Sequence, residues 1–272
     1  MMMTNKILMR NTMLLQFLTI IVLASTFLPN PALAQQKEQK VSTKPAKDDE
    51  LKPQIGRMGE ARGVDPEAFE FSSAERKIWL DDHLDNINSP ARLYYEFVKA
   101  GSYEDGFTDS VYLDVIEINE DGSKNTTLDF FTQDRKQKAG VENLNFIKGN
   151  PVIGIYMQGD VMDMNRLTEG SWRYFQRLIK FAISDDAKIE TISIDFNGKN
   201  IEGEKITITP YVNDPRRRQF ESFANKRYEF IFSKHIPGSL YQINTITPGS
   251  NGSDKEPLIR ETLTLQNVEI RS

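Results

Sequence analysis

Three carboxylates stand close together in the densest part of the sequence, NPVIGIYMQGDVMDMNRLTEGSWRYFQRLIKFAI. Asp160, Asp163 and Glu169 lie there among methionines, aromatic residues and arginines. Carboxylates could act as an acid and a base or hold a metal ion. A calcium loop needs a glycine at its sixth position and a glutamate at its twelfth. Counted from Asp163, these positions hold threonine and tyrosine, so we expect no metal site.

Asp160 and Asp163 also have a structural interpretation. Val161, Met164 and Leu167 can share one helix face, which predicts that both aspartates turn outward near the start of a helix. Acidic side chains favour this place because the helix dipole is positive there. The pattern therefore predicts two solvent-facing carboxylates.

A histidine among acidic residues is the second candidate for chemistry. His83 lies in DDHLD, beside Asp81, Asp82 and Asp85. Such a histidine could bind a metal or act as a base. On a helix these residues spread over more than one face, so a charged, solvent-facing surface is the simpler interpretation. The chain has no cysteine, which excludes thiolate catalysis and sulfur-based zinc sites.

The common catalytic motifs are absent from the sequence. It contains no G-x-S-x-G elbow, no H-E-x-x-H, no phosphate loop and no dinucleotide fingerprint. The pairs Asp105/Asp109 and Asp185/Asp186 could serve sugar hydrolysis, but spacing along the chain does not give their separation in space. Catalysis stays open, although the sequence favours a non-catalytic protein without a cofactor.

One amphipathic helix is expected from the second half of the same stretch. The residues with helical spacing on its apolar side are Trp172, Phe175, Leu178, Ile179 and Ala182. The polar side carries Arg173, Gln176, Arg177 and Lys180. Ser171 can cap this helix, and a shorter helix capped by Ser72 or Ser73 is expected upstream. The apolar side should cover one face of a sheet.

Alternating strand patterns dominate from Leu93 onward. DSVYLDVIEI, ETISIDF, EKITITPYV and RYEFIFS each place apolar side chains on one face. Asn197-Gly198 is the strongest hairpin signal in the chain. We count about eight to ten short strands, many joined by tight turns. These patterns predict an α+β fold, in which a curved antiparallel sheet or partly closed barrel packs against a few amphipathic helices.

The N-terminus has the three parts of a secretory signal. Lys6 and Arg10 provide positive charge, an apolar stretch follows, and Ala32 and Ala34 form a cleavage site. We expect a signal peptide over residues 1–34 and an exported protein, periplasmic or secreted. No later segment is long and apolar enough to span a membrane.

The remaining chain divides into a tether and a domain. Residues 35–68 are charged and nearly free of aromatic and β-branched residues, which is typical of a disordered segment. Residues 69–272 are expected to form a single α+β domain. Within it, residues 247–257 have no apolar periodicity and predict a mobile surface loop or a lid.

The charge of the chain limits its partners. After cleavage, 32 basic residues stand against 39 acidic ones, a net charge of −7. Nucleic-acid binding is not expected, because it depends on neutralising phosphates. Residues 215–218, PRRR, form the only dense basic cluster. The simpler interpretation is a solvated turn, and contact with phosphate or anionic lipid is the alternative.

Three long runs of the sequence resemble uncharacterised secreted or periplasmic proteins of Gram-negative bacteria. They are SPARLYYEFVKAGSYEDGFTDSVYLDV, NPVIGIYMQGDVMDMNRLTEGSWRYFQRLIKFAI, and YVNDPRRRQF with RYEFIFSKHIPGSLYQI. The likeness spans most of residues 70–246. It implies an exported location and identifies no functional residue.

Three functions are compatible with these patterns. The first is a periplasmic carrier for a lipid-like, apolar or amphipathic ligand, because lipoprotein-sorting proteins and other lipid carriers share such an architecture. The others are an envelope-polymer hydrolase that uses carboxylates or His83, and a non-catalytic protein that binds an envelope partner. The candidate lining residues of a carrier are Tyr94, Phe97, Met157, Met164, Trp172 and Phe175.

Overall fold

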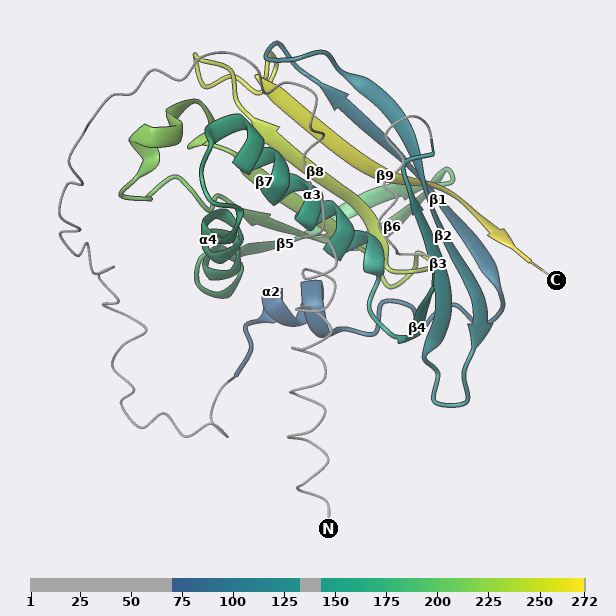
Figure 1. Cartoon of the computed structure of the whole chain (residues 1–272). Helices are drawn as coiled ribbons and strands as arrows, with labels where there is room; N and C mark the ends of the chain where they lie inside the picture. Colours follow the sequence, from purple (N-terminus) through teal and green to yellow (C-terminus); the bar gives the residue numbers. More distant parts are fainter. Residues whose placement is uncertain (1–69, 133–142, 272) are drawn as a thin grey trace, which may run out of the picture. The chain divides into compact units, whose positions relative to one another are not determined.

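The computed structural model describes residues 70–132 and 143–271. The predicted signal peptide and the predicted tether lie outside the described residues. Among the described helices, none combines the length and the apolar character that crossing a membrane requires. The described chain forms one nine-stranded sheet with helices packed against it (Figure 1).

Two antiparallel meanders make up the sheet. The N-terminal strands are β1 (Ala91–Ala100), β2 (Phe107–Ile118), β3 (Lys124–Phe130) and β4 (Leu144–Ile147). The C-terminal strands are β5 (Lys188–Phe196), β6 (Lys199–Ile208), β7 (Arg227–Phe232), β8 (Leu240–Thr247) and β9 (Ile259–Ile270). The strand order is β4-β3-β2-β1-β9-β8-β7-β6-β5, so the pairing of β1 with β9 joins the meanders.

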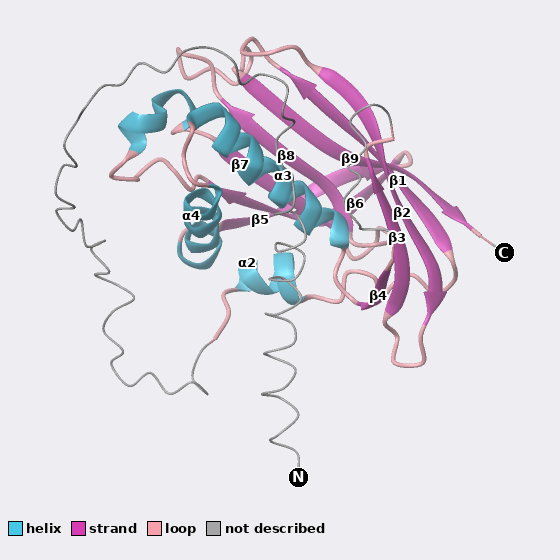
Figure 2. Ribbon diagram, viewed as in Figure 1, coloured by secondary structure: helices cyan, strands magenta, loops and turns pink. Residues whose placement is uncertain are grey.

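The predicted α+β architecture is confirmed. The helices lie against one side of the twisted sheet (Figure 2), and β4 and β5 form its two edges, so the described strands do not close into a barrel. The predicted hairpin at Asn197-Gly198 joins β5 to β6, and both turn residues have positive φ, 54° and 73°. This conformation matches the twist of paired strands.

Four helical regions of the described chain accompany the sheet. A short upstream region consists of α2 (Ser73–Glu75) and η3 (Arg76–Leu80). Of the two predicted caps, Ser72 is the N-cap, and it forms a reciprocal capping box with Glu75. The long helices are α3 (Pro151–Thr168) and α4 (Trp172–Asp185), and a short 3-10 helix, η4 (Arg217–Phe223), precedes β7.

The apolar side of α4 faces the interior, as predicted. Phe175, Ile179 and Ala182 are buried, whereas Trp172 at the start of the helix is only half-buried beside Arg173. Ser171 occupies the N-cap position, but its side chain makes no cap hydrogen bond. Each large apolar side chain removed from water in this way contributes ~1.5–3 kcal/mol.

Alternation along β1 separates the two faces of the sheet. Leu93, Tyr95 and Phe97 are buried beneath the helices, and Tyr94 lies on the other face, where its ring stacks on Tyr112. The core lies between the sheet and the helices, because successive strand residues point to opposite faces.

The loop predicted over residues 247–257 connects β8 to β9. The Arg227 guanidinium donates a 2.8 Å hydrogen bond to the Asp254 carboxylate, and Arg260 donates to the Asp254 carbonyl at 2.8 Å. The backbone N–H of Ser102 also donates to the Pro257 carbonyl at 3.1 Å. These bonds hold the loop against β7, β9 and the end of β1.

Candidate functional site

Four of the six predicted lining residues share one apolar core. Phe97 on β1, Met157 and Met164 on α3, and Phe175 on α4 are each at most 6% exposed. Tyr94 lies on the opposite face of the sheet, since it differs from Phe97 by an odd number of strand positions. Trp172 lies at the N-terminus of α4, with the Arg173 guanidinium 4.4 Å from its ring. The six residues therefore do not line one surface.

Phe97 belongs to a group of five rings that we call the aromatic cluster. Its ring centroid lies 5.3 Å from Phe107, 4.9 Å from Phe131 and 6.3 Å from Tyr156. Phe130 joins through Phe131 at 4.8 Å. Phe107 and Phe131 are partly exposed, whereas the other three rings are buried. The cluster thus runs from the core to the surface at the ends of β2 and β3.

A row of mostly polar side chains crosses the buried face of the sheet beside this cluster. The strand registers place its members directly opposite one another on five adjacent strand pairs. We call it the polar rung. From β2 to β6 it consists of Phe107, Lys99, Glu261, Thr245, Tyr228 and Ile208.

Asp160 of α3 contacts the β7 side of the polar rung. Its carboxylate accepts hydrogen bonds from the Lys226 ammonium at 2.5 Å and from the Tyr228 hydroxyl at 2.7 Å. Tyr228 accepts in turn from the Tyr211 hydroxyl at 2.9 Å, because its own proton is engaged with Asp160. Asp160 and Lys226 are each only 3% exposed. Both charges are therefore held by each other inside the protein.

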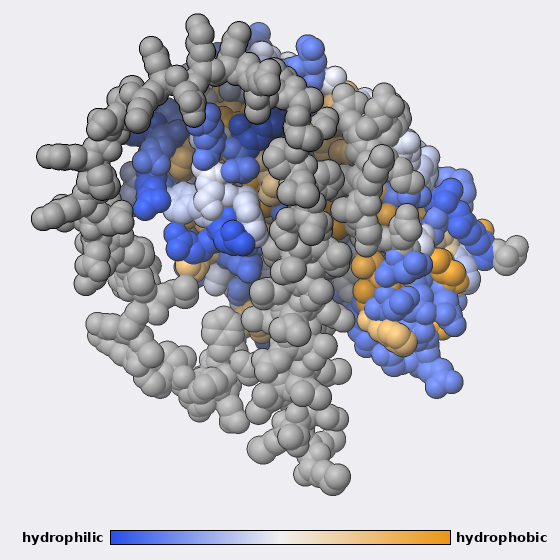
Figure 3. All heavy atoms as spheres, in the orientation of Figure 1, coloured by the Kyte–Doolittle hydropathy of each residue, from blue (hydrophilic) through white to orange (hydrophobic). Residues whose placement is uncertain are grey.

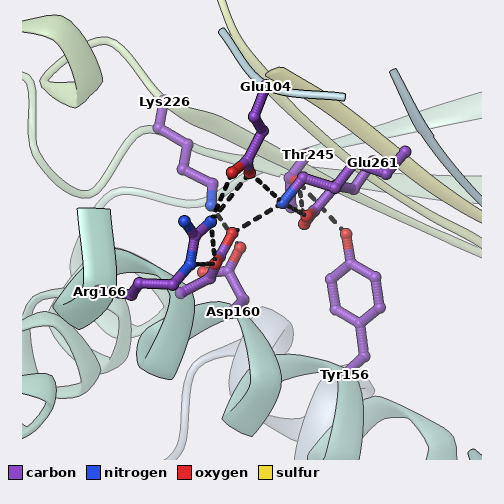
Figure 4. Close-up of polar contacts among 9 residues, drawn as sticks. Glu104, Tyr156, Asp160, Arg166, Lys226, Thr245 and Glu261 are labelled. Carbon is purple, nitrogen blue, oxygen red and sulfur yellow. Dashed lines mark hydrogen bonds and ion pairs between the residues drawn. The ribbon is translucent and has the colours of Figure 1, made fainter. Parts of the chain in front are cut away.

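Lys99 occupies the β1 side of the polar rung. Its ammonium lies 2.7 Å from Glu104, 2.9 Å from Asp163 and 3.0 Å from Glu261. Arg166 binds Asp163 and Glu104 as well, at 2.7 and 2.9 Å. We call the three cations and four carboxylates the charge cluster, part of which is shown in Figure 4. Its members are Lys99, Glu104, Asp160, Asp163, Arg166, Lys226 and Glu261.

The predicted outward direction of Asp160 and Asp163 is wrong. The helix begins at Pro151, with Asn150 as its N-cap, so Asp160 lies in the middle of α3 and not in its first turn. Both aspartates point toward lysines from other elements. The partners lie 64 and 66 residues away along the chain, and only the tertiary structure brings them close.

Burial and charge pairing act on the pKa values of the charge cluster in different directions. Burial raises the pKa of Glu261, despite the nearby Lys226 and Lys99. Burial opposes the charged form of Lys226, but Asp160 and Glu261 outweigh it and raise the pKa of Lys226. Burial likewise opposes ionisation of Asp163, yet Lys99 and Arg166 lower its pKa. The carboxylates of the charge cluster exceed its cations by one.

The charge cluster attaches α3 to the sheet. Its lysines are surrounded by carboxylates, so they are not available for a bound anion. In the described part of the chain, no group of three or more His, Asp or Glu side chains could hold a metal ion. Tyr156 adds a further contact, a 3.2 Å hydrogen bond to the Thr245 hydroxyl.

His83 is buried, in contrast to the solvent-facing position that the sequence indicated. It is 2% exposed and its ring stacks on Phe232 at 5.4 Å. Its Nδ1 accepts a 3.0 Å hydrogen bond from the Asn150 N–H, so the proton is on Nε2, which donates to the Lys77 carbonyl at 2.6 Å. Burial lowers the pKa of His83. Both ring nitrogens are engaged, which disfavours a role as a catalytic base.

The other carboxylate pairs named from the sequence do not form a buried dyad. Asp109 is buried and its Oδ1 accepts hydrogen bonds from the Ser110 N–H at 2.7 Å and from the Thr132 N–H at 2.9 Å. Its predicted partner Asp105 is exposed, as are Asp185 and Asp186 at the end of α4. Asp109 thus anchors the backbone at Thr132, just after the end of β3.

Sequence reasoning missed most of the residues that the tertiary structure brings together. Lys99, Lys226 and Glu261 were not identified, because isolated charged residues are usually exposed. Glu261 and Lys99 do stand at core positions of alternating strand patterns. A charged residue at an inward position of a strand is therefore the signal that could have identified Lys99 and Glu261, whereas Lys226 precedes β7 and carries no such signal.

Comparisons with known proteins give only weak matches. No protein-family model matches the chain, and no curated protein does. The lipoprotein LppX of Mycobacterium tuberculosis has 8% identity and a TM-score of 0.29, covering 69% of this chain and 91% of that one. LprF of Mycobacterium bovis has 11% identity and a TM-score of 0.28, covering 75% and 97%.

A third match is a chain in the MucA/MucB complex of Pseudomonas aeruginosa. It has 12% identity and a TM-score of 0.29, with 68% of this chain and 54% of that chain covered. At these TM-scores and identities the three matches establish neither a common fold nor a common function.

Proposed function

We propose that this protein is a carrier that binds an apolar or amphipathic ligand at the aromatic cluster. The supporting observation is that the rings form a continuous apolar path from buried Phe97 to the partly exposed Phe107 and Phe131. An apolar chain placed along this path would leave water and contact aromatic faces, which is favourable.

The side chains beside this path favour a ligand of variable shape. Met157 and Met164 lie in the same core on α3, and methionine adapts to irregular apolar surfaces. The charge cluster keeps the middle of α3 in place above the sheet. We expect a ligand to displace methionine and phenylalanine side chains while the helix stays attached.

The proposed location is the cell envelope or the exterior. The signal peptide would cover residues 1–34, with cleavage before Gln35, and residues 35–68 would tether the single domain over residues 69–272. A charged tether of this length would give the domain reach to a membrane or an envelope partner.

Uptake of a fluorescent apolar probe tests the carrier function. The mature chain should bind 1-N-phenylnaphthylamine and increase its fluorescence. Replacing the two partly exposed rings, F107A with F131A, should raise the Kd of the probe about tenfold, because two aromatic contacts are lost. Phe131 has a φ of 65°, and alanine, like phenylalanine, carries a Cβ atom. The substitution therefore removes the ring and leaves the left-handed backbone conformation equally demanding.

F181A provides the matched control. Phe181 is 41% exposed on α4 and lies outside the aromatic cluster. The proposal fails if the wild-type chain takes up no probe, or if F181A weakens binding as much as the double variant. Circular dichroism and urea unfolding of each variant show whether the fold is retained.

A further inference from the structure

Five exposed arginines gather on a surface away from the aromatic cluster. Arg173 and Arg177 are one turn apart on α4. Of the other three, Arg216 is the N-cap of η4, and Arg217 and Arg218 are its first two residues. We call them the basic patch. Its members are Arg173, Arg177, Arg216, Arg217 and Arg218. Figure 3 shows a largely hydrophilic surface over α4 and η4, on the left of the view.

Tyr174 joins the two segments of the basic patch. The Arg177 guanidinium lies 5.5 Å from its ring centroid and the Arg216 guanidinium 5.2 Å. The Tyr174 hydroxyl donates to the Asp214 carboxylate, with oxygen distances of 2.7 and 2.6 Å. Asp214 also accepts a 2.7 Å hydrogen bond from the Arg216 backbone N–H. The one buried carboxylate at this place thus fixes the turn against α4.

These arginines are not neutralised within the protein. Over residues 70–132 and 143–271, none of the five forms an ion pair, whereas Arg92, Arg166 and Arg227 each bind a carboxylate. Glu221 of η4 is exposed and makes no ion pair with them in the same ranges. In a chain with an acidic net charge, this concentration of free positive charge indicates an anionic partner.

Aromatic side chains flank the basic patch. Trp172 is half-buried with Arg173 stacked on it, and Phe181 is 41% exposed one turn after Arg177. Phe181 and the two arginines of α4 lie on its solvent-facing side, whereas Trp172 belongs to its apolar side. A surface that combines arginines with an exposed phenylalanine can bind an anionic bilayer through both electrostatic attraction and burial of apolar area. The arginines are also spread over two elements and do not converge on a pocket, which fits an extended anionic surface better than a single phosphate.

We propose that the basic patch docks the domain onto a membrane surface of anionic phospholipid. Each arginine near such a surface should increase affinity about fivefold, and salt should weaken the attraction by screening it. Phe181 would enter the headgroup layer. This inference is independent of the aromatic cluster, so either proposal can fail while the other holds.

Vesicle flotation of the mature chain tests the docking surface. The chain should float with vesicles of phosphatidylethanolamine and phosphatidylglycerol (3:1) at low salt and be released by 0.5 M salt. The variant R173Q/R177Q/R218Q should bind these vesicles roughly 100-fold more weakly, because it removes three arginines that each increase the affinity about fivefold. The matched control, K199Q/K234Q/K255Q, removes the same charge from exposed lysines outside the patch and should bind as the wild type does.

Three outcomes would overturn the proposal. The wild-type chain could fail to float, it could float equally with neutral phosphatidylcholine vesicles, or the control could lose as much affinity as the patch variant. Probe uptake by the patch variant should equal that of the wild type. This measurement separates the docking result from the carrier function. Circular dichroism and urea unfolding show that the variant is folded, whether or not the wild-type chain takes up the probe.

Discussion

At Asp160, a buried carboxylate and a buried ammonium compensate each other. Each would be very costly inside the protein without the other, because the interior solvates charge poorly. Tyr228 and Tyr211 extend the pair into a chain of hydrogen bonds that satisfies the second oxygen of Asp160. The consequence is that loss of one partner should be far worse than loss of both.

The variant D160N tests this asymmetry. It should lower the free energy of unfolding by about 3–5 kcal/mol, because the Lys226 charge stays buried without its main partner. Urea unfolding followed by tryptophan fluorescence measures the change. The double variant D160L/K226M should recover most of the loss, and equal instability of the single and double variants would contradict this account.

Glu261 should contribute to the free energy of unfolding a term that decreases as pH rises. Its pKa is raised in the folded state, so the folded protein holds this proton more tightly than the unfolded chain does. The contribution of Glu261 to stability therefore decreases as pH rises from its ordinary value of 4.5 through the higher folded pKa. Asp163 acts in the opposite sense, since its lowered pKa costs stability as pH falls.

The variant E261Q should isolate the contribution of Glu261. It equalises cations and carboxylates in the charge cluster, and the glutamine carbonyl can still accept from Lys99. Unfolding free energies measured between pH 4.5 and 8 should fall less with pH in E261Q than in the wild type. E256Q alters an exposed glutamate and serves as the control. Parallel pH profiles for E261Q and the wild type would refute the assignment.

At the scale of elements, α3 is held at both its start and its middle. Asn150 caps the helix by accepting from the Val152 N–H at 3.1 Å, and its amide donates to the Tyr95 hydroxyl and the Gly238 carbonyl, both at 3.0 Å. The His83 ring accepts from the Asn150 N–H. One side chain thus connects α3 to β1 and to the β7–β8 turn.

The N-cap residues of α3 and α4 should therefore contribute different amounts to the free energy of unfolding. N150A should lower the free energy of unfolding by about 2–4 kcal/mol. It removes the helix cap, and it leaves the buried polar groups that bonded to the Asn150 side chain without that hydrogen bond. S171A should change the free energy of unfolding by less than about 0.5 kcal/mol, since Ser171 makes no cap hydrogen bond. Thermal or urea unfolding measures both, and similar losses in the two variants would disprove the difference.

At the scale of the whole molecule, the last strand connects the two meanders. β9 lies between β1 and β8, so the N-terminal strands reach the C-terminal ones only through it. Leu263 and Leu265 of β9 lie in the core. The protein should therefore not fold until β9 has been synthesised.

Two truncations test this dependence on β9. Removing residues 259–272 should abolish cooperative unfolding, because the sheet would be divided at its centre. Removing residues 35–68 should change the free energy of unfolding by less than about 0.5 kcal/mol if they form a disordered tether. Calorimetry of both truncated chains gives the result. A cooperative transition without β9 would show that the meanders fold separately.

Local patterns in the sequence were sufficient for the elements and their class. The strand alternation, the Asn197-Gly198 turn and the apolar side of α4 depend on neighbours within a few residues. Such signals do not require knowledge of distant partners. The antiparallel sheet with helices on one side was predicted correctly for this reason.

Only the tertiary structure decided which side chains meet. Asp160 and Lys226 are 66 residues apart, and Lys99 and Asp163 are 64 apart. Nothing local indicates that such charges are buried, because an acidic residue on a helix is equally suited to solvent. The strand register likewise decided that Tyr94 and Phe97 lie on opposite faces of the sheet, and the helix start decided that Trp172 lies at the first position of α4. Pairing across the sheet is a property of the whole chain, and it determined the composition of the interior.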